Sequence, residues 1–531
     1  MRPSKSAALV LIAAVCLSIG LRCIVILKKT TLEHDDGISF LAATGHQDAY
    51  DEAIQGKAPL GNWARALEWK SFLKADSRFC FKNIGRDLAA TDVHPPLYFW
   101  ILHVWILLVG THLWTGPALN AIFGLLCMFF LFLLARKALG GGTKAAFAVL
   151  IWSLSPAVLS TSSQTRPYEL LAMLTILFSW RAMIFLENGK EKTKSWETVF
   201  LTVLAALGLL SHYTFILIIG AWVVLAFAKR KRVQKSRLWA AGAAVGSGIV
   251  LFLAVHPLFY QSIIRESRER QPFSLGELPL RIKQSGLALV SFFSIQTIPQ
   301  YFLLGIFAAS ALTYFWVRRR RSPGNASGMS ARGVQSKDVS PAGFLFGWTA
   351  GVSILLYLLS LVPRHAMEPR YLSLVWPFLA ILIVSLVDKI PGKKPVWVAL
   401  VFLAGYTILG SLPVLSAVSV KPGAAGLLSS AQKIVIDNPA RGILPRIIWH
   451  VPDETEVFIA GQEKLLAEQS AWLPELGPGD FIVSELSYGN SADKRERLLD
   501  LLRGRFEIAF RPGGVYGLGI VLEITARLTP L

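Results

Sequence analysis

Cysteine is scarce in this chain, with only Cys16, Cys23, Cys80 and Cys127 among 531 residues. Three of the four lie inside apolar runs, and no CxxC pair occurs. These observations argue against a disulfide framework and against a cysteine-rich metal centre.

Acidic residues are also few, 34 against 54 lysines and arginines, so the formal net charge is +20. A strongly basic balance often accompanies nucleic-acid binding. In this chain, however, the basic residues form short clusters between apolar runs and are not interleaved with aromatic residues in a binding face. This pattern is typical of cytoplasmic loops in membrane proteins, so we expect no nucleic-acid partner.

Two further patterns are missing. We find no internal repeat, although many transporters are built from repeats with polar sites near the membrane midplane. No small-residue cleavage site follows the first apolar run, and that run is too long for a cleaved signal peptide. We therefore expect the N-terminal segment to be a retained signal anchor. Its Arg22 lies near the outer end of the first span, where the charge is expected to snorkel to the membrane surface.

Long apolar runs are abundant. Hydrophobic residues make up 53% of the chain, its mean hydropathy is +0.50, and about 20 apolar residues suffice to cross a bilayer. The sequence therefore predicts an all-α, polytopic membrane protein. We predict eleven spans, at residues 7–27, 117–135, 145–162, 168–186, 197–210, 212–228, 238–256, 301–317, 343–362, 371–387 and 395–413.

Charge assigns a side of the membrane to each connection. The run 97–110 is shorter than a span and is expected to lie in the membrane interface without crossing it. With this assignment the basic connections 136–144, 190–194, 229–237 and 318–321 all fall on one side, which the positive-inside rule makes the cytoplasm. The N-terminus is then cytoplasmic and the C-terminus extracytoplasmic.

The chain is expected to form two domains. Residues 1–419 make the membrane domain, and its first external loop, 28–116, carries helices along the membrane surface. Residues 420–531 have balanced charge and Pro/Gly turns, which predict a small soluble extracytoplasmic α/β domain. Its expected strands lie at 456–460, 480–484 and 515–524, and its expected helix at 493–503.

An acidic cluster follows the first span, in the stretch Leu32-Glu33-His34-Asp35-Asp36-Gly37. Carboxylates at a bilayer boundary are costly unless they are hydrated, paired or functional. Other unusual polar residues also fall at outer span ends in the predicted topology: His94, Arg166, His212, Arg364, His365 and Arg370.

This combination indicates phosphate chemistry at the depth of the lipid headgroups. Arginine binds phosphate through a fixed fork of donors, and a carboxylate can take a proton from an acceptor hydroxyl. A lipid-linked phosphate substrate would use both. Structural roles remain open for individual residues: Arg166 and Arg370 as interfacial anchors next to tyrosines, His94 as a loop cap and His212 as a helix start.

The chain resembles bacterial members of glycosyltransferase family 39, relatives of the protein O-mannosyltransferases and of the lipid A aminoarabinose transferase. The resemblance implies the GT-C membrane fold and an inverting transfer from a polyprenyl-phosphate sugar on the extracytoplasmic face of the plasma membrane. It spans about residues 7–413 and rests on these motifs, in order: His34-Asp35-Asp36-Gly37, His94-Pro95-Pro96-Leu97-Tyr98, Ser163-Gln164-Thr165-Arg166-Pro167-Tyr168, His212-Tyr213 and Pro369-Arg370-Tyr371-Leu372.

Carried over by position, the resemblance makes Asp35 the general base, with Asp36 beside it in the catalytic pair, where the family often has Glu. The substrate-binding residues are then His94, Arg166, Tyr168, His212, Arg370 and Tyr371. The turn with Arg166 is one residue shorter than the common family form. A divalent cation remains open as a cofactor, with His34, Asp36 and His94 as candidate ligands.

Two alternatives to the transferase remain open. One is a flippase or transporter of lipid-linked sugars that uses the same polar pocket without covalent chemistry. The other is an inactive GT-C-like subunit. The lack of a repeat and the gathering of polar residues on one face favour the enzyme over a transporter. The sugar, hexose or pentose, and the acceptor, protein, lipid or glycan, are not encoded in a readable motif.

Overall fold

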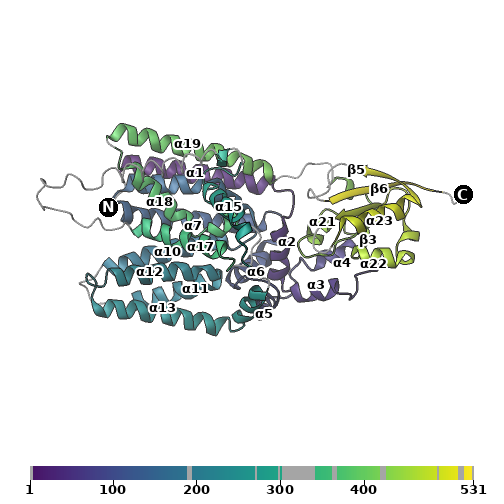
Figure 1. Ribbon diagram of the computed structural model, residues 1–531, viewed down its shortest axis with the longest axis horizontal. Helices are drawn as coiled ribbons and strands as arrows, with labels where there is room; N and C mark the ends of the chain where they lie inside the picture. The colour runs from purple at the N-terminus through teal and green to yellow at the C-terminus, as the bar shows by residue number, and fades with distance from the viewer. Residues whose placement is uncertain are drawn as a thin grey trace, which may run out of the picture.

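Long helices lie side by side in a bundle, and a small sheet with its own helices sits beyond one end of the bundle (Figure 1). The computed structural model describes residues 4–187, 194–268, 272–296, 299–301, 341–361, 367–390, 392–418, 426–486, 490–511 and 519–528. The predicted span 301–317 lies almost wholly outside these residues, and so do Arg364 and His365.

Among the described residues, six helices are long and apolar enough to cross a membrane: α1 (Lys5–Lys28), α7 (Thr115–Leu139), α10 (Tyr168–Glu187), α13 (Lys235–Val255), α17 (Pro341–Leu358) and α19 (Lys393–Ala417). A seventh candidate is the pair α8 (Gly142–Ser153) and α9 (Pro156–Ser163), which is bent by 54°. Four apolar segments are shorter: α6 (Leu97–Val109), α11 (Ser195–Ser211), η1 with α12 (Tyr213–Ala228) and α18 (Trp376–Val387). The predicted multi-pass helical fold is confirmed, whereas the count of eleven spans stays a prediction.

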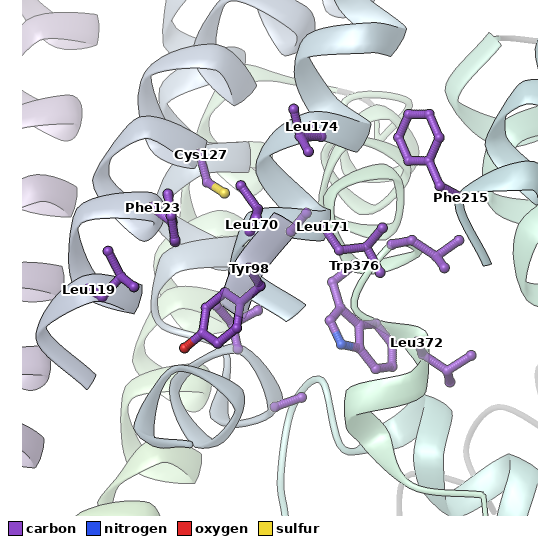
Figure 2. Packing of buried hydrophobic residues seen from close by; sticks show 14 of the residues in the cluster. Tyr98, Leu119, Phe123, Cys127, Leu170, Leu171, Leu174, Phe215, Leu372 and Trp376 are labelled. Atoms are coloured by element: carbon purple, nitrogen blue, oxygen red, sulfur yellow. The ribbon is translucent and has the colours of Figure 1, made fainter. Parts of the chain in front are cut away.

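An apolar core holds these helices together. Figure 2 shows part of it, with side chains from four helices: Tyr98 of α6, Phe123 and Cys127 of α7, Leu171 of α10 and Trp376 of α18. All five are fully or almost fully buried, with Phe123 the most exposed at 7%. The core therefore joins the short helix α6 to longer helices of the bundle.

The predicted inner connections that the structure describes, 136–144 and 229–237, lie at the end of the bundle away from the sheet (Figure 1). Ser6 Oγ, near the chain start, lies 3.2 Å from Thr143 Oγ1 at the start of α8. Lys144 Nζ is 2.6 Å from Asp388 Oδ2, which follows α18. Polar contacts thus join segments that are distant in sequence. These segments lie at the end of the bundle away from the sheet.

The charge of Arg22 in α1 is buried, contrary to the expectation that it snorkels to the membrane surface. Its Nη2 lies 3.1 Å from Glu169 Oε1 of α10, and both side chains are at most 3% exposed. A Cβ atom at Gly124 would come within 2.6 Å of the guanidinium, so only glycine leaves room for it there. The expectation was wrong because the partner carboxylate is 147 residues away in sequence.

Removing one member of this pair should destabilise the fold. Arg22→Met leaves Glu169 buried without its partner, which costs about 3–5 kcal/mol when a buried pair is broken. The double variant Arg22→Met/Glu169→Leu should regain most of the wild-type Tm, since apolar replacements of buried pairs are often neutral. Thermal unfolding of the purified variants in one detergent tests this. A double variant as unstable as Arg22→Met would contradict it.

The first loop folds into short elements between the bundle and the sheet: α2 (His34–Thr44), α3 (Gln47–Ile54), β1 (Trp63–Arg65), α4 (Ala66–Ser71) and α5 (Phe81–Thr91). Helices were predicted in this loop, but a strand was not. β1 pairs antiparallel with β3, placing Ala64 opposite Val457. The loop therefore contributes the edge of a sheet whose other strands come from the C-terminal part of the chain.

The sheet has six strands in the order β1-β3-β2-β4-β6-β5. β3, β2 and β4 are parallel, and the outer pairings are antiparallel. Beyond β1, the strands are β2 (Lys433–Ile436), β3 (Glu456–Ile459), β4 (Phe481–Glu485), β5 (Phe506–Arg511) and β6 (Gly519–Arg527). The expected strands at 456–460 and 480–484 and the helix α23 (Ala492–Arg503) are present, and part of the strand expected at 515–524 lies in β6. The sequence interpretation missed β2 and β5.

The C-terminal segment packs directly on α2. The Cβ position of Gly37 lies 2.9 Å from Pro445 Cβ, at the start of α21 (Leu444–Ile448), and the His34 ring lies over Gly442. Arg441 Nε is 3.2 Å from Asp51 Oδ1. The contacts of Gly37 and His34 hold the first turn of α2 against the sheet-bearing part of the chain, whereas the Arg441 pair joins α3 to it.

Gly442→Ala should therefore disturb the first turn of α2. A methyl group at this position collides with the His34 imidazole, and overpacking of this kind costs about 1–3 kcal/mol. We expect a lower Tm than that of the wild type. Gly461→Ala is the matched control, because its Cβ meets no atom within 4 Å. Equal behaviour of the two variants would show that the docking contact does not position α2.

Candidate active site

Asp35 lies in the first turn of α2 and is only 8% exposed. Arg166 Nη2 donates to its Oδ1 over 2.7 Å. Arg370 Nη1 donates to its Oδ2. Three residues from separate motifs, more than 130 positions apart in sequence, thus meet at one carboxylate. The structure brings together the main residues that the motifs indicated.

Arg166 also faces a second carboxylate, which the sequence interpretation missed. Its Nη1 lies 3.8 Å from Asp92 Oδ2, and Asp92 Oδ1 accepts a hydrogen bond of 2.6 Å from His94 Nδ1. The proton of His94 must then be on Nδ1, which leaves Nε2 as an acceptor. Asp92 lies two residues before His94 in the His94-Pro95-Pro96 motif. This short spacing could have identified Asp92 as a site residue from the sequence.

Arg166 retains unused donor capacity. Its side chain is 6% exposed, and neither Nε nor Nη1 has a hydrogen-bond partner within the described residues. A buried donor without a partner carries a free-energy penalty of about 1–3 kcal/mol. An anionic ligand that reaches these atoms would remove that penalty.

Asp36 has a different environment from Asp35. It is fully buried, and its Oδ2 lies 2.7 Å from Lys29 Nζ and accepts from the Glu33 backbone N–H. Its Oδ1 accepts from the backbone N–H of Thr165, over 2.6 Å. Asp36 therefore ties the end of α1 and the start of α2 to the turn that carries Arg166. Lys29 was also missed, although it immediately precedes the acidic stretch.

Aromatic rings line the neighbourhood of the two arginines. The rings of His94 and His212 are 5.4 Å apart, and those of Tyr168 and His212 are 5.8 Å apart. The Arg370 guanidinium lies 5.4 Å from the centre of the Tyr371 ring. The remaining predicted binding residues are thus near Arg166 and Arg370, and His212 also caps η1 (Tyr213–Phe215) by accepting from the Thr214 N–H.

Charge pairing sets the protonation states. Burial raises the pKa of Asp35, but the charges of Arg166 and Arg370 lower it by more, so this pKa lies well below its usual range. Burial likewise raises the pKa of Asp92, and interactions with His94 and Arg166 outweigh that effect. Burial lowers the pKa of His94 by more than Asp92 raises it. At neutral pH both carboxylates are charged and the imidazole is neutral.

The directions of these pKa shifts predict how kcat/KM depends on pH. Asp35 and Asp92 lose their charge only well below pH 4, and His94 gains a proton only below about pH 6.5. None of the three should produce an ionisation in kcat/KM between about pH 7 and 8. Profiles of the wild type and of His94→Gln test this. A midpoint in that window that disappears in the variant would contradict the assignment.

The candidate metal ligands do not form a cation site. Asp36 is engaged by Lys29, His94 by Asp92, and the His34 ring lies against Gly442. Within the part of the chain that is described, no group of three or more His, Cys, Asp or Glu side chains is arranged to hold a metal ion. His34, Asp36 and His94 therefore do not fit a divalent cation as a set of ligands.

Comparison with known proteins gives two findings. A family model described as dolichyl-phosphate-mannose-protein mannosyltransferase matches residues 93–257, a segment that includes His94, Arg166, Tyr168 and His212. No curated protein sequence matches significantly.

Solved structures share the fold. The crystal structure of ArnT from Cupriavidus metallidurans bound to undecaprenyl phosphate matches with a TM-score of 0.51 at 14% identity, over 96% of this chain and 97% of ArnT. The apo crystal structure of the same protein matches with a TM-score of 0.52 at 14% identity and the same coverages. The resemblance to glycosyltransferase family 39 is thereby confirmed: the chain has the membrane fold of ArnT and, over residues 93–257, the sequence pattern of the dolichyl-phosphate-mannose-protein mannosyltransferases.

Proposed function

We propose that this protein is a membrane glycosyltransferase that moves a sugar from a polyprenyl-phosphate donor to an acceptor hydroxyl, with inversion at the anomeric carbon. The observation that carries the proposal is the Asp35 carboxylate held between Arg166 and Arg370, with donor atoms of Arg166 still unpaired. The fold of ArnT, whose crystal structure contains undecaprenyl phosphate, supports the choice of donor.

In this proposal Asp35 is the general base. Its carboxylate takes the proton of the acceptor hydroxyl while the hydroxyl oxygen bonds to the anomeric carbon. The bond from that carbon to the phosphate oxygen breaks, and polyprenyl phosphate leaves. Arg166 and Arg370 stabilise the negative charge that develops on the departing phosphate.

Asp35 is a weak base while it binds both arginines, because its pKa is so low. A donor phosphate that engages Arg166 and Arg370 would share their positive charge. The pKa of Asp35 would then rise toward its usual range, and the carboxylate would be freed for the acceptor. Donor binding would thus make Asp35 a stronger base, whereas in the empty site Asp35 would remain a weak base.

Asp36, Asp92 and Lys29 act as positioning residues in this scheme. Asp36 and Lys29 fix the helix start that carries Asp35, and Asp92 holds the other terminal nitrogen of Arg166. His94, Tyr168, His212 and Tyr371 would surround the sugar or its phosphate.

We place the site at the extracytoplasmic face of the plasma membrane. Basic connections of the bundle meet at the end away from α2, as the contacts of Lys144 and Thr143 illustrate. Under the positive-inside rule that end is cytoplasmic, so Asp35 and the C-terminal sheet lie outside.

Release of free polyprenyl phosphate tests the function. Purified protein in nanodiscs is supplied with a panel of polyprenyl-phosphate sugars and with membrane extract as the source of acceptor. Release from one donor would establish the reaction and name the sugar. Tight donor binding without release from any of them would favour the flippase or the inactive subunit instead.

A further inference from the structure

A cavity far from Asp35 lies between α10, α11, α12 and α13. Its volume is about 490 Å³, within the range of ligand pockets in proteins. Its walls are almost entirely apolar and include Phe178, Phe185, Trp222 and Leu238. Phe185 and Leu238 lie near the ends of α10 and α13 that are remote from Tyr168, the first residue of α10, whereas Phe178 and Trp222 lie near the middle of α10 and α12.

The mouth of the cavity is cationic. Arg230, in the α12–α13 connection, and Lys235, at the start of α13, both line it. Within the described part of the chain, neither of them forms an ion pair. The neighbouring Arg237, by contrast, is buried, lies 3.8 Å from Glu197 and donates to the Phe185 carbonyl. The α12–α13 connection lies at the end of the bundle away from α2 (Figure 1).

We propose that this cavity binds an anionic phospholipid, with an acyl chain between the helices and the phosphate at Arg230 and Lys235. Arg230 donates to the Phe227 carbonyl and lies over the Phe227 ring, but within the described residues neither cation faces a carboxylate. An apolar slot with such cations at its mouth matches a chain attached to an anionic headgroup, and basic pockets between membrane helices bind such lipids. The rim points to the same ligand, because Trp239 and Phe227 line the cavity yet are 80% and 65% exposed.

The cavity is separate from the proposed donor site. Along α10, Phe185 is 17 residues beyond Tyr168, which corresponds to about 26 Å of helix. A phosphate at Arg230 is therefore at the opposite end of the bundle from Arg166. The bound lipid would brace the far half of α10, whose first turn follows Arg166.

Native mass spectrometry of the full-length protein in detergent tests the proposal, with phosphatidylglycerol and phosphatidylcholine of identical chains as probes. The double variant Arg230→Gln/Lys235→Gln should bind phosphatidylglycerol about 30-fold more weakly, since each cation near an anionic lipid contributes roughly fivefold. Lys229→Gln/Lys231→Gln removes equal charge from the same connection without touching the cavity, and should bind nearly as the wild type does.

A second pair of variants tests the apolar part. The Cβ position of Gly242, on the cavity wall, meets no atom within 4 Å, so Gly242→Leu fills open space without a clash. Excluding about two methylene groups should weaken phosphatidylglycerol binding about 15-fold. Gly246→Leu, one turn later and off the cavity, is the control, because its Cβ position is equally open.

Three results would overturn the proposal. They are equal binding of phosphatidylcholine and phosphatidylglycerol, equal weakening by the control variants, and displacement of phosphatidylglycerol by polyprenyl phosphate. The last would assign the cavity to the isoprenoid chain of the donor. Because lipid binding is measured without turnover, none of these results depends on whether the proposed transferase reaction is correct.

Discussion

Asp35→Asn is expected to lower the rate of sugar transfer by about 10²–10⁴-fold, the usual contribution of a general base. The amide cannot accept the proton of the acceptor hydroxyl. In the wild type Arg166 and Arg370 donate to different carboxylate oxygens, so the single amide oxygen can accept from one of them while the NH2 group faces the other. Asparagine keeps the size of the side chain, and both arginines remain available to the donor phosphate. The loss should therefore appear in kcat while the fold and donor binding persist.

Asp51→Asn is a matched control for this change. Asp51 lies in the same loop and pairs with an arginine, Arg441, over 3.2 Å, but Arg441 comes from the C-terminal segment and not from the Arg166 or Arg370 motifs. Its replacement should leave polyprenyl-phosphate release close to the wild-type rate. Release by Asp35→Asn at a rate similar to that of Asp51→Asn would eliminate Asp35 as the base.

Arg166→Ala is expected to weaken donor binding by about 10–150-fold, since hydrogen bonds to charged groups contribute about 1.5–3 kcal/mol each. The change removes the guanidinium that lies between Asp35 and Asp92. Two buried carboxylates would then repel the donor phosphate. The effect should appear as a higher KM for the donor together with a lower kcat, because the same charge stabilises the leaving phosphate.

Donor titrations of Arg166→Ala, Arg166→Lys and Arg441→Ala distinguish this role from general destabilisation. Arg166→Lys keeps the charge but not the planar fork, so it should restore only part of the affinity. Arg441→Ala removes an arginine away from the site and should leave donor kinetics nearly unchanged. Wild-type donor kinetics in Arg166→Ala would rule out the phosphate site.

Part of the site was predictable from short motifs. Asp35, Arg166 and Arg370 lie in separate motifs at the ends of predicted spans, and hydropathy with loop charge placed all three on one side of the membrane. Their convergence follows from that placement, because helices that cross the same bilayer bring their ends to a common level. The match over residues 93–257 agrees with the motifs around His94 and Arg166.

Other parts were not predictable, because they depend on partners distant in sequence. Arg22 was expected at the membrane surface, yet it pairs with Glu169. Asp92 has a local partner in His94, but its contact with Arg166 joins residues 74 positions apart in sequence. β1 is three residues long and acquires its strand conformation by pairing with β3. Short segments of this kind have little intrinsic preference, so tertiary contacts set their structure.

The sequence alone predicted a multi-pass helical membrane protein, and it predicted the residues that meet at Asp35. Both follow from local properties: the length of apolar runs, the placement of basic loops and the order of short motifs. The ion pairs of Asp35, the positioning role of Asp36, the docking of the C-terminal segment on α2 and the cationic cavity at Arg230 emerged only from the folded chain. Each depends on the distance and burial of groups from separate elements, and such electrostatic and packing relations have no counterpart in linear order.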